Sequence, residues 1–494
     1  MNELSYAILI FITLFLLVII ADFIQKKFKV DPKSTRMFVH ASVAIVVFFA
    51  PLMLRNEIFP IALASIFIFA NFTTSRLRMF QGINLSDRNL GTVYYPLSFL
   101  ILILLFWDSK SFLVSTAMIV MGFADPLAAV FGRRATKPHI VEAFGEKKTL
   151  EGSVAMFAMA TLSVFLGILF FRDGFGQLKE INYIQLIIMS ATVGLVVAPV
   201  ELISPKSTDN LTVPLISALI IDILVSNHHI IVPFAFGELL AIIFGFVSFR
   251  LKFLSKDGSV AAFLIGSFLF GLGGWKWTLP MLFFFLAGSL GSRLFLKHKS
   301  VYNLMYEKGH TRDAGQVFAN GGVGLGIFLI QFLYPNPLWY LSYLGSLSAV
   351  TADTMATELG ILSIKDPFSF VQMKRVEKGV SGGVSYLGTF AGLLSGGALG
   401  LVALPFADVY RVFPIRLIVA IAFSGLIGSI ADSLIGGSIQ GQYQCEICLK
   451  ITERENHCGR NSTKLVRGYE WVNNDLVNFT ASAVGAIAMM LLFV

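Results

Sequence analysis

Residues 121–153, MGFADPLAAVFGRRATKPHIVEAFGEKKTLEGS, break an apolar segment with a polar loop and then turn apolar again. Asp125 lies inside the first apolar part, where a carboxylate costs about 2.5–3.5 kcal/mol in a membrane helix and is expected to face a bundle interior or a site. Cations, a carboxylate and a serine that can begin a helix gather before the next apolar part, and a metal-bound polyphosphate needs such groups. Lys and Arg also flank membrane helices for topological reasons, so each cation has an alternative explanation. The polar residues are Arg133, Lys147, Lys148, Glu151, Gly152 and Ser153.

The whole chain is too apolar for a water-soluble protein. Of its 494 residues, 56% are hydrophobic and 14% are charged, and the mean hydropathy is +0.76. One core could not hide so much apolar side chain. The predicted fold class is therefore all-α, a polytopic transmembrane helix bundle of about 16 spans in two fused membrane domains. We place the domains at residues 1–228 and 229–494.

Membrane topology explains the charge of the chain. Its net charge is +8, but the cations lie in short loops between apolar segments, which favours a membrane protein over a nucleic-acid-binding one. Most of these loops fall on one side of the predicted arrangement, which the positive-inside rule makes cytoplasmic. Residues 1–22 form a long apolar run without a basic start or a cleavage site, so they predict a retained helix. We expect a protein integral to the inner membrane of a prokaryote, with its polar motifs at the cytoplasmic side.

A second polar interruption, APVELISPKSTDNLTVPLISA, occupies residues 198–218. Its three prolines disfavour a regular helix across it. The interruption adds carboxylates, an amide and a cation at what the pattern predicts is the same membrane face. These residues are Glu201, Lys206, Asp209 and Asn210.

The second half of the chain carries further polar motifs. RDAGQVFANGG begins at Arg312, TADTMATELG at Thr351 and KRVEKGVSGGVS at Lys374. Each acid or amide alone is explained as a helix cap or a solvated loop residue, whereas several at one membrane face favour a metal and phosphate site. The candidates are Arg312, Asp313, Gln316, Asn320, Asp353, Glu358, Lys374, Arg375, Ser381, Gly382, Asp432 and Asp475.

A cysteine-rich segment near the end of the chain offers a different metal. The three cysteines, Cys445, Cys448 and Cys458, exclude a disulfide framework, and His457 lies beside the last of them. Three thiolates and one imidazole complete a tetrahedral structural zinc site. Free reduced thiols are the alternative.

The two halves also share a spacing. Asp125 precedes Gly132 by the same interval as Asp353 precedes Gly360, and a cationic pair follows each glycine. The shared spacing indicates two divergent versions of one phosphotransferase design, although no fixed-period repeat accompanies it.

The motifs of the first half resemble those of a known family. D-x6-G-R from Asp125, KK-T-x-E-G-S from Lys147 and E-x2-S-P-x3-D-N-x2-V-P from Glu201, with R-x3-H from Arg36, resemble the CTP-dependent polyprenol kinases. That family includes phytol kinase and dolichol kinase and is related to phosphatidate cytidylyltransferase. The resemblance implies CTP as phosphoryl donor, a prenyl alcohol as acceptor and Mg²⁺ as cofactor. It implies metal or base roles for Asp125, Glu201 and Asp209, and nucleotide binding by Arg133, Lys147, Lys148, Glu151, Gly152, Ser153, Lys206 and Asn210.

The motifs of the second half resemble the integral membrane family that includes the plant phytyl-phosphate kinase. This resemblance covers roughly residues 235–494 and implies a second phosphorylation, for which the donor nucleotide stays open. It assigns Asp353, Glu358, Asp432 and Asp475 to catalysis, with Asp353, Asp432 and Asp475 as Mg²⁺ ligands. The nucleotide-binding candidates are Arg312, Asp313, Gln316, Asn320, Lys374, Arg375, Ser381 and Gly382.

Together these motifs predict a bifunctional integral membrane kinase. It would convert an isoprenoid alcohol such as phytol, farnesol or geranylgeraniol to its monophosphate and then to its diphosphate. The expected partners are the alcohol, its monophosphate, a nucleoside triphosphate and the lipid bilayer, without nucleic acid and with the oligomeric state left open. One alternative is a cytidylyltransferase, which transfers CMP to a lipid phosphate and releases pyrophosphate. The other is a transporter, which moves a substrate without consuming nucleotide.

Overall fold

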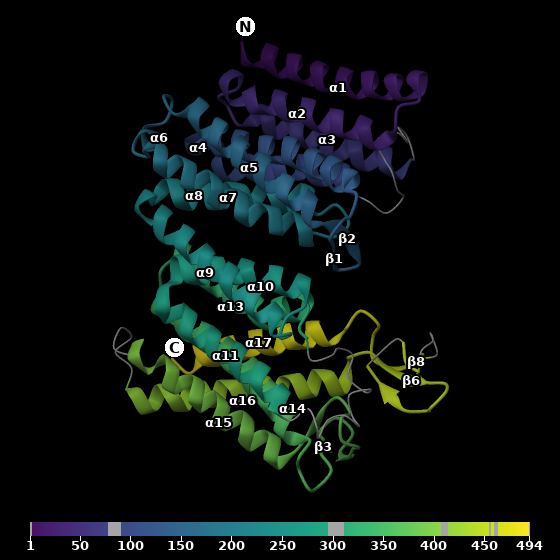
Figure 1. Cartoon of the computed structure of the whole chain (residues 1–494), viewed down its shortest axis with the longest axis vertical. Helices are drawn as coiled ribbons and strands as arrows, with labels where there is room; N and C mark the ends of the chain where they lie inside the picture. The colour runs from purple at the N-terminus through teal and green to yellow at the C-terminus, as the bar shows by residue number, and fades with distance from the viewer. Residues whose placement is uncertain are drawn as a thin grey trace. The chain divides into compact units, whose positions relative to one another are not determined.

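The computed structural model describes residues 2–77, 90–294, 311–406, 413–453, 456–458 and 463–493. The chain divides into two compact units, Met1–Leu239 and Leu240–Val494. Figure 1 shows both as bundles of helices, with small sheets at the helix ends. The boundary lies within one helix, α9, slightly later than the boundary that the sequence suggested. The functions assigned to the two domains stay predictions.

Long apolar helices build the first unit, and one short hairpin joins two of them. The helices are α1 (Glu3–Phe28), α2 (Pro32–Met53), α3 (Ile58–Arg76), α4 (Gly91–Arg134), α5 (Leu150–Phe171), α6 (Gly176–Lys179), α7 (Tyr183–Ile203), α8 (Asp209–Ser226), the 3-10 helix η1 (His228–Ile230) and α9 (Ile231–Arg250). Strands β1 (Ile140–Ala143) and β2 (Glu146–Thr149) pair antiparallel between α4 and α5.

Helix α4 turns back on itself. A straight helix of its 44 residues would be about 66 Å long, twice the apolar thickness of a bilayer. Lys110 leaves helical geometry at φ −143° and ψ 41°. Tyr95 Oη then lies 3.5 Å from the carbonyl oxygen of Met118, so the two limbs pack side by side. Lys110 itself forms an ion pair with Asp222 of α8.

The second unit surrounds a buried central helix, α14. Its helices are α10 (Lys256–Phe268), the π-helix η2 (Leu269–Gly273), α11 (Gly274–Leu294), α13 (Ala314–Leu333), α14 (Pro337–Gly360), α15 (Tyr386–Ala403), α16 (Pro414–Ser438) and α17 (Asn474–Leu491). Small residues let the helices approach α14 closely. A Cβ at Gly428 of α16 would lie 2.3 Å from the Cβ of Ala349, and one at Gly485 of α17 would lie 2.6 Å from the carbonyl oxygen of Gly345. Close packing of this kind stabilises helix pairs inside a membrane, where no hydrophobic effect separates helix from lipid.

Two small antiparallel sheets complete the second unit. The first has the strand order β4-β3-β5, from β3 (Phe368–Ser369), β4 (Lys374–Arg375) and β5 (Gly383–Val384). The second has the order β7-β6-β8, from β6 (Gln442–Cys445), β7 (Ile451–Thr452) and β8 (Thr463–Arg467). Both sheets lie at the same end of the second unit (Figure 1).

The predicted membrane class is confirmed. The described residues contain 13 helical segments that are long and apolar enough to cross a membrane. The count of about 16 stays a prediction for two physical reasons. Helix α4 and the segment Lys256–Gly291 each count once although each contains a bend, and α14 is buried in the bundle and more polar than its neighbours.

Candidate active sites

Three carboxylates of the first unit meet where α4, α7 and α8 come together. Asp125 comes from the second limb of α4, Glu201 from the last turn of α7 and Asp209 from the first turn of α8. One ligand oxygen of each lies within 4.8 Å of the others. The fold thus brings Glu201 and Asp209 to Asp125, which is far from both in the sequence. These are the three carboxylates of the first half for which the sequence suggested metal or base roles.

Lys148 lies among these carboxylates. Its Nζ donates hydrogen bonds to Glu201 Oε1 at 2.6 Å, to the Glu201 carbonyl oxygen at 2.6 Å and to Asp209 Oδ2 at 3.0 Å. Burial opposes the charge of Lys148, but the two carboxylates outweigh it and hold the pKa of Lys148 above its usual value. The lysine therefore stays charged in the physiological range and offsets part of the negative charge around it.

Two other cations that the sequence suggested, Lys147 and Arg133, contact other residues. Lys147 points away from the carboxylates because side chains alternate along a strand. Lys147 precedes Lys148 on β2, and its Nζ lies 3.5 Å from Glu142 Oε2 on the exposed side of the hairpin. Arg133 lies in the last turn of α4, and its Nη1 is 3.8 Å from Asp31 Oδ2. Of the three cations assigned to the triphosphate, the structure brings Lys148 to the carboxylates.

The first turn of α5 holds the hairpin in place. Thr149 is its N-cap, and its Oγ1 accepts a hydrogen bond from the Gly152 backbone N–H at 3.2 Å. Glu151 accepts a hydrogen bond from the His139 backbone N–H at 3.1 Å and lies 2.7 Å from its Nδ1. Ser153 hydrogen-bonds to the Thr149 carbonyl oxygen at 3.3 Å. The sequence did not single out Thr149 and His139, although a threonine three residues before Gly152 is a typical helix cap.

The turn between α7 and α8 is tight, and Pro205 is the one proline of this segment that lies in it. Pro199 and Pro214 lie within regular helix, and the break is confined to residues 204–208. Lys206 and Ser207 adopt left-handed φ values of 49° and 61° there. Lys206 is exposed on this turn.

Asn210 adds an oxygen ligand beside the carboxylates. The residue is 1% exposed, and its Nδ2 donates to Asp209 Oδ1 at 3.2 Å. Its Oδ1 is buried and accepts no hydrogen bond from any described residue. Octahedral Mg²⁺ takes oxygen ligands at about 2.0–2.1 Å. The three carboxylates and this amide offer oxygens of the type that Mg²⁺ binds.

An apolar cavity of about 140 Å³ lies among α1, α2, α3 and the first limb of α4. His40, Asn71 and Tyr95 are polar members of its wall. One turn before His40, Arg36 comes so close to the start of α4 that a Cβ at Gly91 would lie 2.9 Å from its Nη2 and 2.8 Å from the Ser207 Cβ. Arg36 and Ser207, two residues before Asp209, therefore both lie close to the start of α4.

A larger cavity, of about 380 Å³, opens in the second unit and has both polar and apolar groups in its wall. It collects side chains from α13, α14, α16 and α17 and from the loop that precedes α15. Eight of the residues that the sequence suggested line it, together with residues from two other polar segments. The eight are Arg312, Gln316, Asn320, Asp353, Glu358, Ser381, Gly382 and Asp432.

Four of the suggested residues do not line this cavity. Asp313 is the N-cap of α13 and forms a reciprocal capping box with Gln316. Lys374 and Arg375 lie on the exposed strand β4. Asp475 lies in the first turn of α17, where its neighbours Asn474 and Asn478 line the cavity.

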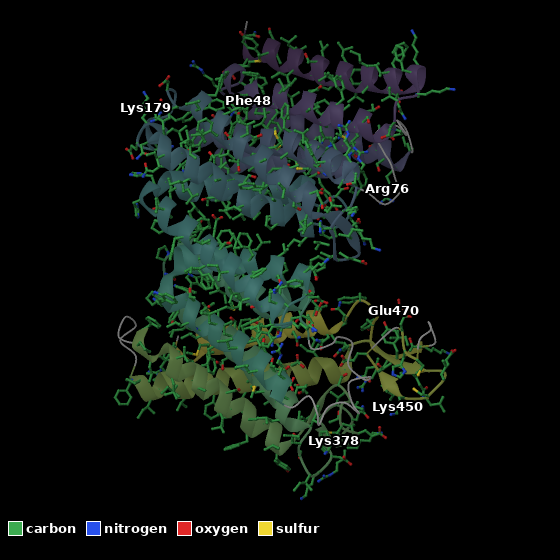
Figure 2. The ribbon with its side chains drawn as sticks, viewed as in Figure 1. Phe48, Arg76, Lys179, Lys378, Lys450 and Glu470 are labelled. Atoms are coloured by element: carbon green, nitrogen blue, oxygen red, sulfur yellow. The ribbon has the colours of Figure 1, made fainter. Side chains whose placement is uncertain are left out.

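Two cations stand at the cavity wall. Burial lowers the pKa of Arg312 to about 10, an effect that the Glu358 carboxylate opposes, so the guanidinium stays charged. The guanidinium carbon of Arg312 lies 5.3 Å from the ring centre of Phe284. Lys378 donates from its Nζ to the Ser363 carbonyl oxygen at 2.5 Å, and Figure 2 shows it at the sheet end of the second unit.

The loop Gly379–Ser385 closes the cavity against α16. At Gly382 the φ is +81°, and a Cβ there would lie 2.5 Å from the Gly437 Cα, so the loop needs glycine at this position. Ser381 Oγ donates to Glu453 Oε1 at 2.5 Å. Glu453 also lines the cavity. The sequence missed it because it lies in the cysteine-rich segment, where only the thiols and the histidine were considered.

The two units repeat one local packing arrangement. In each, a helix with the D-x6-G spacing crosses a helix that begins with a capped glycine turn. A Cβ at Gly132 would lie 2.6 Å from the hydroxyl oxygen of the cap, and one at Gly360 would lie 3.0 Å from it. The next helix repeats the contact, because a Cβ at Gly152 or Gly388 would lie 3.0 or 2.7 Å from a carbonyl oxygen of the first helix. The corresponding pairs are Asp125 and Asp353, Ala128 and Ala356, Gly132 and Gly360, Thr149 and Ser385, and Gly152 and Gly388.

The four residues suggested as zinc ligands also come together. One ligand atom from each of Cys445, Cys448, His457 and Cys458 lies within 4.8 Å of the others. Among the described residues, they and the carboxylates of the first unit are the two groups of this density.

Comparison with known proteins shows the family of the chain. The family model for integral membrane protein DUF92 matches residues 239–486. An uncharacterized membrane protein of Methanocaldococcus jannaschii is 28% identical over 241 residues, which cover 49% of this chain and 86% of that protein. Protein VTE6, chloroplastic, of Arabidopsis thaliana is 24% identical over 244 residues, covering 48% of this chain and 65% of that protein.

A phytol kinase of Synechocystis is 33% identical over 131 residues, which cover 26% of this chain and 52% of that protein. These matches confirm the family resemblance that the motifs predicted. No solved structure matches the chain.

Proposed function

This chain belongs to the integral membrane protein family DUF92, and from that membership and its two polar sites we propose that it is a two-step kinase for isoprenoid alcohols. The first site uses CTP to phosphorylate the alcohol, and the second phosphorylates the resulting monophosphate. The similarity to a phytol kinase supports the substrate class. We place the protein in the inner membrane of a prokaryote with both sites on the cytoplasmic side, where CTP is made.

The observation that carries this proposal is Lys148 held between Glu201 and Asp209 beside Asp125. Phosphoryl transfer requires donor and acceptor in line, with cations and metal absorbing the charge of the phosphates. A part-buried, charged lysine next to three carboxylates provides the cation and the metal ligands of that requirement. Mg²⁺, held by Glu201, Asp209 and Asn210, would neutralise the phosphates of CTP.

In the first step the alcohol oxygen forms a bond to the γ-phosphorus, the bond from that phosphorus to the β-γ bridging oxygen breaks, and CDP leaves. The hydroxyl proton needs a base. Lys148 donates to Glu201 and Asp209, which leaves Asp125 as the carboxylate best suited to accept the proton. Lys148 stabilises the phosphate oxygens, and the cavity among α1–α4 receives the prenyl chain with its polar end toward Arg36.

In the second step the acceptor is already ionised, because the second pKa of a phosphate monoester is about 6. It therefore needs countercharge more than a base. Arg312 and Lys378 supply this at the cavity wall, and backbone N–H groups of the loop Gly379–Ser385 add to it. Asp353 and Asp432 are the carboxylates that would share Mg²⁺ with the substrate phosphates, which is how this ion is usually bound.

Product analysis of purified protein tests the proposal. The full chain in detergent receives γ-labelled CTP, Mg²⁺ and a panel of prenyl alcohols, and the products are separated by mass. We expect labelled monophosphate first and diphosphate after it. A CMP-bearing lipid with released pyrophosphate would instead support a cytidylyltransferase, and substrate flux in vesicles without CTP consumption would support a transporter.

A further inference from the structure

The cysteine-rich segment has the dimensions of a zinc site. His457 Nδ1 lies 3.4 Å from Cys448 Sγ and 3.3 Å from Cys458 Sγ. A tetrahedral zinc ion with Zn–S of about 2.3 Å and Zn–N of about 2.0–2.1 Å places such atoms about 3.6 Å apart. Cys445 completes the set from a fully buried position. Three thiolates and one imidazole form a closed structural site rather than an open catalytic one.

The backbone around the site turns to bring the ligands together. Leu449 N–H donates to the Cys445 carbonyl oxygen at 2.9 Å, which closes the turn between Cys445 and Cys448. Leu449 and Cys458 adopt φ values of 60° and 54°. Each such residue costs about 1–3 kcal/mol and persists only where its surroundings enforce the conformation.

Few of the described apolar residues of the sheet β6–β8 and its turns are buried. Tyr443 is 8% exposed, whereas Ile447 and Leu449 in the turn after β6 are 60% and 68% exposed, and Val466 on β8 is 48% exposed. A small segment of this kind is typically stabilised by a metal, whose binding energy becomes folding energy. The metal site thus accounts for the order of the sheet.

The same sheet is fixed to the second active site at two points. At Gly468 a Cβ would lie 2.1 Å from the carbonyl oxygen of Gln440, a residue of the cavity wall. Glu453 directly follows β7, and its carboxylate accepts the hydrogen bond from Ser381 in the loop that closes the cavity. The metal ligands are therefore connected to the loop through the sheet, then through Glu453 after β7, and then through the hydrogen bond from Ser381.

We propose that Cys445, Cys448, His457 and Cys458 bind one Zn²⁺, and that this zinc-stabilised sheet positions Glu453 to hold the loop Gly379–Ser385 at the second site. Glu453 is a positioning residue, because it acts on bound phosphate through Ser381. The functional part of this inference rests on the proposed second phosphorylation. The zinc site and the ordering of the loop do not depend on it.

Metal analysis and hydrogen exchange test the inference on the full chain in detergent. The wild type should hold one zinc per chain, and Cys448→Ser should lose it. Glu453→Gln should keep the zinc. Both variants should show faster amide exchange at residues 379–385 and about 10-fold slower conversion of supplied prenyl monophosphate, while phosphorylation of the alcohol is unchanged. Glu470 is an exposed acid that follows β8 of the same sheet (Figure 2), so Glu470→Gln is the matched control and should behave as wild type.

The outcomes separate the two proposals. Absence of zinc from wild type purified in zinc-containing medium would overturn the inference, as would loss of zinc without a change in exchange at residues 379–385. If Cys448→Ser does not fold, chelation of zinc from the wild type replaces it. If the zinc and exchange results hold but no protein makes diphosphate, the inferred link stands and the proposed second step is wrong.

Discussion

At the scale of single residues, the first site depends on a lysine that only the fold distinguishes from its neighbour. Lys147 and Lys148 are chemically equal in the sequence, and the resemblance assigned both to nucleotide. Side chains alternate along β2, so Lys147 contacts Glu142 on the surface, whereas Lys148 contacts Glu201 and Asp209. A short strand between two helices could not be read from two adjacent lysines.

Lys148→Met should therefore abolish the first step, whereas Lys147→Met should hardly affect it. The first change removes a charge that contacts two carboxylates and, in our proposal, the transferred phosphate, so we expect a loss of about 100-fold or more in alcohol phosphorylation. The matched change removes an exposed ion pair, which contributes little. Initial rates with CTP and phytol measure both. Retained conversion of supplied monophosphate shows that Lys148→Met is folded, and equal losses in the two variants would contradict the assignment.

At the scale of elements, glycine sets the distance between the helices that carry the acids. In α15, Gly388 meets the Ala356 carbonyl oxygen of α14, whereas Gly397 on the same helix has open space at the Cβ position. The spacing D-x6-G was visible in the sequence. The sequence did not show that the glycine of this spacing allows its helix to pack closely against the capped start of the next helix.

Gly388→Ala should lower both stability and the second activity, and Gly397→Ala should change neither. The added methyl in the first variant forces α14 and α15 apart at a cost of about 1–3 kcal/mol, and Asp353 lies one turn from the contact. Thermal unfolding of the purified protein and the rate of diphosphate formation give the two readouts. A Gly388→Ala protein as stable and active as Gly397→Ala would show that the crossing tolerates a side chain.

The cavity among α1–α4 makes a prediction about chain length. Ala50 lines it three turns along α2 from His40, so Ala50→Phe should shorten the apolar end and leave the polar end intact. We expect kcat/KM for geranylgeraniol to fall by about 10-fold, with geraniol little affected, because the clash concerns only the far part of a long chain. Leu104→Phe, at an exposed position of α4, is the control. Equal losses for long and short alcohols would place the prenyl chain elsewhere.

At the scale of the whole molecule, composition and hydropathy were enough to predict a helical membrane protein, since 56% hydrophobic residues leave no soluble alternative. They were not enough to predict the count of spans. A bend at Lys110 and a polar central helix, α14, depend on tertiary contacts that no hydropathy window contains.

The candidate sites divide in the same way. Asp125 and Asp353 could be singled out because each lies inside an apolar segment. A carboxylate is costly there unless it faces the bundle interior or a site. Asp313 and Asp475 are the same type of residue but lie at helix starts. Asp313 caps α13, and Asp475 lies in the first turn of α17, whose cap is Asn473. Glu453 was missed because its contact with Ser381 is made across two loops that are 72 residues apart.

Separate loss of the two steps in one pair of variants tests the central claim most directly. Asp125→Asn, Asp353→Asn and Glu142→Gln as a surface control are given γ-labelled CTP, Mg²⁺ and either phytol or phytyl monophosphate, and each product is quantified. We expect Asp125→Asn to make no monophosphate from the alcohol yet to convert supplied monophosphate at the wild-type rate, whereas Asp353→Asn should accumulate monophosphate and stop there. Failure of Asp125→Asn to convert supplied monophosphate, failure of Asp353→Asn to make monophosphate from the alcohol, or diphosphate formed by Asp353→Asn would contradict two independent phosphotransfer sites in one chain.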